Sequence, residues 1–114
     1  MKAVFIELPA FERHRTVYLD DDSFRALQNQ LMRHPEAGDP MPDTGGLRKL
    51  RVADSRRGKG KRGGLRVIYY WWAEGMQYWL FTVYDKDEMA DLSAQQRKSL
   101  KAMIKLELDA RRPR

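Results

Sequence analysis

Cysteine is absent from the 114 residues of the sequence. Disulfide bonds and metal sites built on thiolates are therefore excluded, and nothing in the chain argues for an oxidising, secretory environment. Histidine is scarce as well, with two residues, so the chain lacks the Cys/His clusters that bind zinc. We expect neither a metal ion nor another cofactor.

Long hydrophobic runs are also missing. No apolar stretch approaches the roughly 20 residues of a membrane span, and the opening MKAVFIELPAFERHR is too briefly apolar for a signal peptide. Hydrophobic residues still make up 42% of the chain, which favours folding over disorder. The length fits a single domain over residues 1–114 with one modest core, and we expect a soluble, cytoplasmic protein without a membrane partner.

Acidic residues are nearly missing from one segment, which carries the positive charge of the chain. Between Leu47 and Arg66 there are nine basic residues and one acid, Asp54, for a net charge of +8. Because the whole chain carries +6, the remaining residues sum to −2. Such a local excess suits a polyanion such as nucleic acid. A solvated, flexible loop is the alternative interpretation.

The first half of the sequence predicts a strand, a helix and a loop. The strand covers residues 2–8 and ends at Pro9. The helix lies within YLDDDSFRALQNQLMRHP, which has acids at its N-terminus and a proline at its end. Its apolar stripe comprises Phe24, Leu27 and Leu31. Residues 11–19 fit either strand or helix, and proline and glycine make residues 35–46 a loop.

The second half predicts three consecutive strands and a final helix. The strand ranges are 47–53, 65–72 and 76–86. The last two form a hairpin, and the middle one, LRVIYYWW, is apolar on both faces except at Arg66, as in a central strand. The final helix begins with a capping box at Ser93 and Gln96. Its predicted buried stripe comprises Leu100, Met103, Ile104 and Leu108.

Strand, helix, three strands and helix, in this order, predict an α+β domain. The expected architecture is a small antiparallel-rich sheet with helices packed on one face. The other face would be open to a ligand, or lined with Arg, Lys and Tyr. On the strand of residues 47–53, alternation places Arg48, Leu50 and Val52 on one face and Leu47, Lys49 and Arg51 on the other.

The residue types left for chemistry are Arg, Lys and Tyr. The stretch GKGKRGG lacks the spacing of a phosphate-binding loop and leads into a strand instead of a helix. A catalytic pair of His14 and His34 is an alternative, although a histidine at a helix C-terminus needs no catalytic reason. Arg and Lys in a dry cleft can stabilise the phosphorane that forms when a ribose 2′-OH attacks the adjacent phosphate. RNA cleavage by this route needs no metal.

Arg66 is the best single candidate for this chemistry, because it is the lone charge on an otherwise apolar strand. A buried salt bridge to Asp85 or Glu88 is the alternative role. Lys49 and Arg51 share a strand face, and they would join Arg66 in one cleft if that face is open.

Tyr84 and Lys86 end the second strand of the hairpin. Tyr84 fits a role in stacking on a base or donating to a phosphate, and equally the role of a tyrosine at the core edge. Three loop cations suit electrostatic steering of RNA, namely Arg56, Arg57 and Lys59. In the aromatic run YYWW, packing of a central strand explains the residues better than base stacking by Trp71 or Trp72.

The segment GGLRKLRVADSRRGKGKRGGLRVIYYWW, followed by FTVYDKDEMADLSAQQRKSLKAMIK, resembles the HigB-type branch of the RelE/ParE toxin superfamily. The resemblance covers the whole chain, and its most specific parts are the GGLRKLR strand, the GKRGGLRVIYYW segment and the Y-x-K before the last helix. It implies a RelE-like fold and a ribosome-dependent mRNA endonuclease. Such a toxin cuts the codon in the ribosomal A site by the metal-free 2′-OH route and so inhibits translation.

The same resemblance implies residues and partners. The implied catalytic residues are Lys49, Arg51, Arg66, Tyr84 and Lys86. With the basic character of the segment, the expected RNA-binding residues are Arg48, Arg56, Arg57, Lys59, Lys61 and Arg62. The partners would be the ribosome, mRNA and a helix-turn-helix antitoxin of the HigA type. Two alternatives stay open: a ParE-like toxin that poisons DNA gyrase, against which the concentrated positive charge argues, and a plain RNA- or ribosome-binding module.

Overall fold

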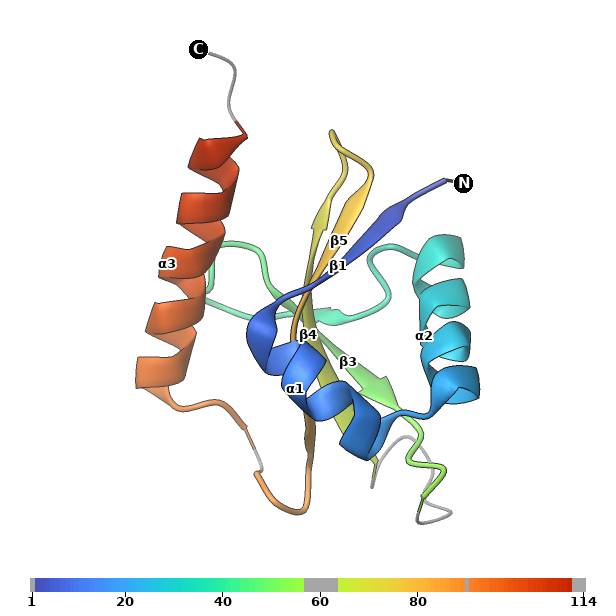
Figure 1. Cartoon of the computed structure of the whole chain (residues 1–114). Coiled ribbons are helices and arrows are strands. Elements are labelled where there is room, and N and C mark those ends of the chain that lie inside the picture. Colours follow the sequence, from blue (N-terminus) through green and yellow to red (C-terminus); the bar gives the residue numbers. More distant parts are fainter. Residues whose placement is uncertain (1, 57–63, 90, 112–114) are drawn as a thin grey trace.

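The computed structural model of the chain describes residues 2–56, 64–89 and 91–111. Within these residues lie five strands and three helices (Figure 1). In chain order they are β1 (Val4–Glu7), α1 (Pro9–Tyr18), α2 (Asp21–Arg33), β2 (Asp39–Pro40), β3 (Arg48–Val52), β4 (Leu65–Trp72), β5 (Gln77–Asp85) and α3 (Ala94–Ala110).

The strands form one mixed sheet in the order β1-β5-β4-β3-β2. β1 runs parallel to β5, and the other neighbouring strands are antiparallel. The predicted hairpin is confirmed as β4 and β5, with an irregularity in the register between Ile68 and Tyr69. β4 is the central strand, as its apolar sequence predicted, and its first five residues are buried.

The α+β class and the antiparallel-rich sheet are confirmed, but the helices do not all pack on one face. α1 and α2 bury Phe11, Leu27 and Leu31 against one side of the sheet. α3 buries Ile104 against the other side, in a second apolar cluster with Ile68 and Trp79. Figure 1 shows the sheet nearly edge-on between α3 and α2. The prediction that all helices pack on one face was wrong because β4 and β5 are apolar on both faces. Each face therefore needs helices to cover it.

Local sequence signals explain where the helices begin. Pro9 ends β1 but also starts α1, because its fixed backbone angle and missing N–H suit the first helical turn. The Asp20 side chain caps α2 by accepting a hydrogen bond from the Ser23 amide at 2.7 Å. The predicted capping box of Ser93 and Gln96 starts α3.

The buried stripe predicted for α3 is partly wrong. Ile104 is buried, and Leu100 and Leu108 pack at the edge of the same apolar cluster. Met103, however, is 38% exposed. The covered stripe is therefore narrower than expected, and Met103 borders the groove between α1 and α3.

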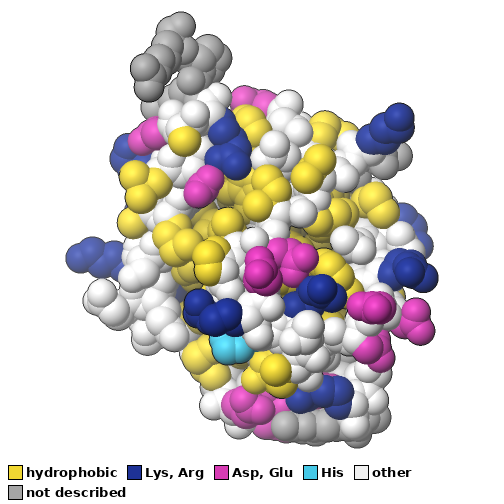
Figure 2. All heavy atoms as spheres, in the orientation of Figure 1, with side chains coloured by type: hydrophobic (Ala, Val, Ile, Leu, Met, Phe, Trp, Pro, Cys, Tyr) yellow, Lys and Arg dark blue, Asp and Glu magenta, His cyan; other side chains and the backbone are white. Residues whose placement is uncertain are grey.

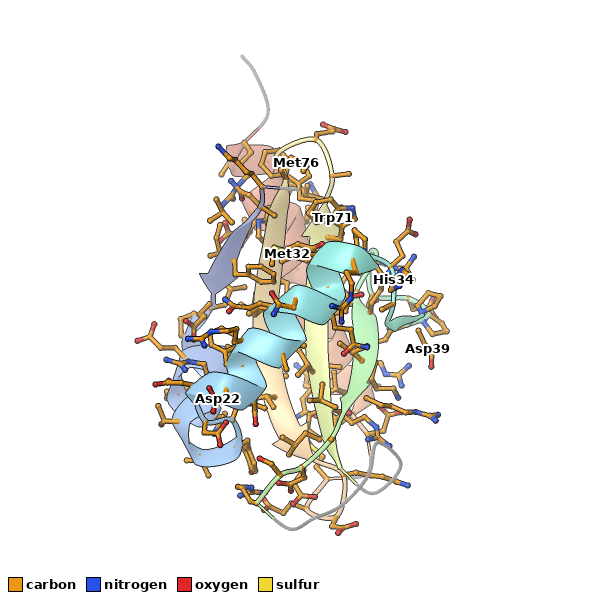
Figure 3. The ribbon with its side chains drawn as sticks, turned by 90° about the vertical axis from the view of Figure 1, so that its right-hand side faces the viewer. Asp22, Met32, His34, Asp39, Trp71 and Met76 are labelled. Carbon is orange, nitrogen blue, oxygen red and sulfur yellow. The ribbon has the colours of Figure 1, made fainter. Side chains whose placement is uncertain are left out.

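The segment between α2 and β3 is mostly loop, as predicted, with β2 as a short addition. The Tyr69 hydroxyl donates to the Pro35 carbonyl at 2.8 Å and accepts from the Gly38 amide at 3.0 Å, which ties this loop to β4. A Cβ atom on Gly38 would lie 2.8 Å from the Tyr69 ring, so this position requires glycine. Figure 3 looks onto α2, which lies across the strands and ends next to His34.

Candidate functional site

Register, not sequence distance, brings the main site residues together. Arg51 on β3 is the direct cross-strand partner of Arg66 on β4, and Arg66 is the direct partner of Tyr84 on β5. Lys49 lies one step along the same face, opposite Ile68. Directly paired residues have Cβ atoms about 5 Å apart and point to the same side of the sheet. We refer to Lys49, Arg51, Arg66 and Tyr84 as the cationic row.

The cationic row lies on the sheet face that α3 covers in part. Tyr84 packs in the same apolar cluster as Ile68, Leu92 and Ile104. Two like charges directly opposite each other destabilise a sheet, so the pair of Arg51 and Arg66 serves folding poorly. This pairing makes sense where an anion binds between the two guanidinium groups.

Burial differs sharply within the row. Arg66 is 6% exposed, and its guanidinium donates to the Leu65 carbonyl at 3.2 Å. Arg51 is exposed and makes no ion pair with any residue in the described part of the chain. β2 pairs with β3 only at Lys49 and Arg48, so Arg51 lies where β3 is the sheet edge. The row therefore runs from the surface at Arg51 into the interior at Arg66.

Tyr84 has an unusual environment for a buried hydroxyl. The residue is 5% exposed, and its Oη atom has no hydrogen-bond partner among residues 2–56, 64–89 and 91–111. Burial raises the pKa of the Tyr84 hydroxyl and the Asp91 carboxylate adds to the rise, whereas Arg66 and Arg97 oppose it. The hydroxyl is therefore protonated at neutral pH and has a hydrogen bond to donate.

Asp91 and Arg97 belong to this site although the sequence did not indicate them. Lys49 Nζ lies 3.5 Å from Asp91 Oδ1, and Arg97 Nη2 lies 2.9 Å from Asp91 Oδ2. Burial alone would raise the pKa of Asp91, but the Leu92 amide and the two cations outweigh it and lower the pKa. The sequence offered one signal for Asp91, an acid shortly before a capped helix. Because this pattern is common in proteins, it does not single out a site residue.

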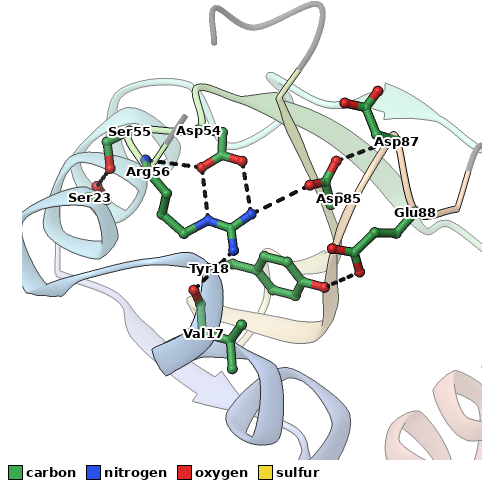
Figure 4. A network of polar contacts seen from close by, with 9 residues as sticks. All are labelled: Val17, Tyr18, Ser23, Asp54, Ser55, Arg56, Asp85, Asp87 and Glu88. Carbon is green, nitrogen blue, oxygen red and sulfur yellow. Dashed lines mark hydrogen bonds and ion pairs between the residues drawn. The ribbon is translucent and has the colours of Figure 1, made fainter. Parts of the chain in front are cut away.

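Arg56, expected to bind RNA, has a different place in the structure (Figure 4). Its guanidinium donates two hydrogen bonds to the buried Asp54 carboxylate, at 3.0 and 2.9 Å, and lies 3.5 Å from Asp85. It also lies over the Tyr18 ring, 4.7 Å from the centroid, and donates to the Val17 carbonyl. We call these five residues the Arg56 network.

The Arg56 network also bears on the role of Arg66. Asp85, the predicted alternative partner of Arg66, lies in this network and is paired across the sheet with Leu65. Neighbouring residues of a strand point to opposite faces, so Asp85 lies on the face covered by α1 and α2. Glu88, the other alternative, accepts a hydrogen bond from the Tyr18 hydroxyl at 2.8 Å.

The remaining predicted site residues are placed as follows. Arg48 lies on β3 beside Lys49 but points to the other face, where it pairs with Glu36 at 2.6 Å. Lys86 is exposed directly after β5, and its amide donates to the Gly64 carbonyl at 3.3 Å. Four predicted RNA-binding residues lie outside the described residues: Arg57, Lys59, Lys61 and Arg62.

The aromatic run on β4 packs as a central strand does. The Trp71 ring lies 4.4 Å from that of Tyr78, and the Trp72 ring lies 5.8 Å from that of Trp79. These contacts favour the packing interpretation over base stacking. The two histidines belong to the opposite face, since His14 is an exposed residue of α1 and His34 caps the end of α2.

Among the hollows beside the sheet, two differ in whether predicted site residues line them. The first, of 290 Å³, includes Lys49 and Arg51 among its lining residues, beside Gln30 and Asp39. The second, of 410 Å³, is a mostly apolar groove between α1 and α3 that includes none of the predicted site residues. Figure 2 shows hydrophobic side chains on this side of the molecule among scattered charges. Lys49 and Arg51 therefore border the first hollow, and Arg51 also borders a further hollow of 200 Å³ beside α2.

A membrane-spanning helix and a metal-binding cluster are both absent from the described residues. No helix among them has the length and apolar character needed to cross a bilayer. In the same part of the chain, no group of three or more His, Cys, Asp or Glu side chains has an arrangement suited to a metal ion.

The chemistry that this arrangement supports is anion binding. Guanidinium groups hold two oxygens of a phosphate at once, and a buried, protonated hydroxyl can donate to a third. A site that excludes water increases the strength of each of these interactions.

Comparison with known proteins agrees with this architecture. No protein-family model matches the chain. The chain is similar in structure to a mutant of the Escherichia coli toxin RelE in the free state, with 13% sequence identity, a TM-score of 0.55, and coverage of 90% of this chain and 97% of that chain. The isolated E. coli RelE toxin has 14% identity and a TM-score of 0.46, over 90% of this chain and 99% of that chain. The first of these likenesses shows that the chain has the fold of the RelE toxin.

Proposed function

We propose that this protein is the toxin of a type II toxin–antitoxin system and acts as a ribosome-dependent mRNA endoribonuclease. The observation that carries the proposal is the direct cross-strand pairing of Arg51 with Arg66 and of Arg66 with Tyr84. The likeness in fold to the toxin RelE supports it, as does the resemblance of the sequence to the HigB-type branch.

The proposed reaction is a transesterification within the RNA. A ribose 2′-oxygen loses its proton and attacks the adjacent phosphorus, and the bond to the 5′-oxygen breaks. The products are a 2′,3′-cyclic phosphate and a 5′-hydroxyl, which takes up a proton. Negative charge builds up on the phosphorane oxygens, which is the charge that pre-oriented guanidinium groups stabilise most.

Each residue of the row has a proposed role. Arg66, held in place by burial, binds the phosphorane, and Arg51 binds the same group from the sheet edge. Tyr84 donates its hydrogen bond to a phosphate oxygen or to the leaving 5′-oxygen. Lys49 and the exposed Lys86 bind the flanking backbone. The basic residues of the segment, Arg48 included, add to the attraction for RNA.

The proposed partners follow from the same resemblance. A HigA-type helix-turn-helix antitoxin neutralises the toxin, and the ribosome presents the mRNA in its A site. The location of these partners makes the cytoplasm the proposed compartment.

The test is primer extension on an mRNA translated in vitro, with and without ribosomes. We expect new 5′ ends within codons only when ribosomes are present. Arg66→Ala should reduce the cleavage rate by about 10²-fold or more. Because Arg66 is buried and its loss could harm folding, Arg51→Ala serves as a second variant, with an expected loss of at least about tenfold.

The matched control is Arg25→Ala, which removes an exposed arginine from α2 on the opposite face of the sheet. This variant should cleave like the unchanged protein. Intact messages combined with arrested translation would refute the nuclease in favour of a ribosome-binding module. Intact messages with unaffected translation and inhibited gyrase would favour the ParE-like activity.

A further inference from the structure

Asp91 joins two cations that come from distant parts of the chain. Lys49 lies on β3 and Arg97 lies in the first turns of α3, while Asp91 precedes the helix cap at Ser93. One carboxylate oxygen faces each cation, at 3.5 Å for Lys49 and 2.9 Å for Arg97. A phosphate group bound between the same two cations would offer its oxygens in the same way.

Tyr84 independently indicates that an anion belongs here. Its hydroxyl is buried without a hydrogen-bond partner among the described residues. Asp91, Arg66 and Arg97 all act electrostatically on the pKa of this hydroxyl, and Arg97 pairs with Asp91 at 2.9 Å. A buried donor without an acceptor is costly for a folded protein, and an incoming phosphate oxygen would remove that cost.

Cations gather on this face of the sheet. Lys49, Arg51 and Arg66 lie on neighbouring strands, and Asp91 is an acid that Lys49 shares with Arg97 of α3. The Asp91 side chain is 43% exposed, so solvent can receive it when it is displaced. Displacement breaks its two ion pairs and the hydrogen bond that its Oδ1 atom accepts from the Leu92 amide at 2.8 Å. Its bonds to the two cations are therefore of the exchangeable, partly exposed kind.

We propose that Asp91 is an internal counter-anion that occupies the place of a nucleic-acid phosphate, and that Arg97 is a further phosphate-binding residue of this site. Binding of single-stranded nucleic acid displaces the Asp91 carboxylate and transfers Lys49 and Arg97 to the phosphate. The inference rests on the proposed function for the identity of the anion as an RNA backbone. It adds to that function a carboxylate that weakens binding until the correct substrate competes with it.

The test measures binding without cleavage. A fluorescein-labelled, mixed-sequence oligonucleotide made entirely of 2′-deoxynucleotides has no 2′-OH to react, and its binding to the full chain is followed by fluorescence anisotropy. Asp91→Asn should bind it about fivefold more tightly, with a steeper salt dependence. Arg97→Gln should bind about fivefold more weakly, and Arg97→Lys should recover most of the loss.

Asp109→Asn is the matched control for charge. Asp109 lies on α3, is exposed and pairs with Lys105 at 2.9 Å. Its substitution by Asn changes the net charge of the chain by the same amount as Asp91→Asn. We expect less than a twofold effect on binding. Equal tightening by Asp91→Asn and Asp109→Asn would overturn the proposal, since only overall charge would then matter.

Other outcomes separate this proposal from the nuclease. Weaker binding by Asp91→Asn, with an unchanged melting temperature, would also overturn it, because the carboxylate would then support the binding surface instead of competing for it. If no variant alters mRNA cleavage but the binding changes are as expected, the nuclease fails and the anion site stands. If Arg66→Ala abolishes cleavage and neither Asp91→Asn nor Arg97→Gln alters binding, the nuclease stands and this proposal fails.

Discussion

The two faces of the sheet treat similar polar residues in opposite ways. On the face covered by α1 and α2, Arg56 is bound by the carboxylates of Asp54 and Asp85. On the face covered by α3, Arg51 is paired across the strands with another arginine, Arg66. The first arrangement pairs an arginine with carboxylates, and the second places two arginines opposite each other.

The buried tyrosines show the same contrast. Tyr78 donates its hydroxyl hydrogen bond to the Leu31 carbonyl at the end of α2. Tyr84, on the other face, has no such partner in the described part of the chain. Both faces carry a buried apolar cluster, and they differ in whether the tyrosine hydroxyl has a hydrogen-bond partner among the described residues.

The comparison predicts a large stability loss when the Arg56 network is broken. Asp54 is fully buried, so Asp54→Ala removes a carboxylate that holds both the guanidinium and the backbone amide of Arg56. Because Arg56 itself is partly exposed, we expect the free energy of unfolding to fall by about 2 kcal/mol. Urea denaturation measures the change. A loss below about 0.5 kcal/mol would place this network among ordinary surface ion pairs.

The Tyr78 hydroxyl predicts an alkaline loss of stability. Burial raises the pKa of Tyr78 to about 12, above the value near 10 of an unfolded tyrosine. A raised pKa means that stability is complete below about pH 10 and is lost as the pH rises toward 12. Tyr78→Phe should lower stability at pH 7 by about 1 kcal/mol through the lost hydrogen bond. It should also make the fall in unfolding free energy between pH 9 and pH 11 smaller by about 1 kcal/mol, and an unchanged slope would contradict this.

Tyr84→Phe should not lower the free energy of unfolding, in contrast to Tyr78→Phe. Removal of a buried hydroxyl without a partner relieves a desolvation cost, so we expect the free energy of unfolding to stay unchanged or to rise by up to about 1 kcal/mol. Cleavage of translated mRNA should nevertheless decrease. Thermal unfolding and primer extension on the same preparation measure the two effects. A clear loss of stability would mean that the hydroxyl is a structural donor like that of Tyr78.

Arg51→Ala should have the smallest effect on stability. The substitution relieves the like-charge pair with Arg66 at an exposed edge position, so the free energy of unfolding should change by less than about 0.5 kcal/mol. Loss of mRNA cleavage in this variant, with an unchanged free energy of unfolding, would show that Arg51 serves activity and not stability. Arg25→Ala should change neither mRNA cleavage nor the free energy of unfolding. It therefore shows whether an effect of Arg51→Ala comes from its position or from the loss of one surface charge.

Much of the fold was readable from local patterns. The hairpin of LRVIYYWW with its partner, the helix stop at Pro35 and the capping box at Ser93 all involve neighbours in sequence, so they were predicted correctly. The placement of α3 was predicted wrongly. An apolar strand shows that both of its faces are covered, but it does not show which helix covers each face. The parallel pairing of β1 with β5 joins residues about 70 positions apart and leaves no local signal.

The candidate site divides in the same way. Lys49, Arg51 and Arg66 were identifiable as cations on two strands. The structure pairs Arg51 with Arg66 and places Lys49 on the same face. Arg56 was identified by charge alone, but its neutralisation depends on Asp54, two positions earlier, and on Asp85 at the end of β5. Asp91 and Arg97 were missed because their importance comes from the ion pair of Asp91 with Lys49 on the sheet, and Arg97 pairs with that same carboxylate.

The sequence by itself determined the kinds of elements, the central strand and the segment in which positive charge is concentrated, because hydrophobic period and composition are local properties. The tertiary structure alone decided which charges are shared with carboxylates and which stand beside one another. Strand side chains alternate between faces, so the register between strands selects the neighbours of each arginine. Long-range packing sets that register, and with it which arginine pairs with carboxylates and which lies opposite another arginine.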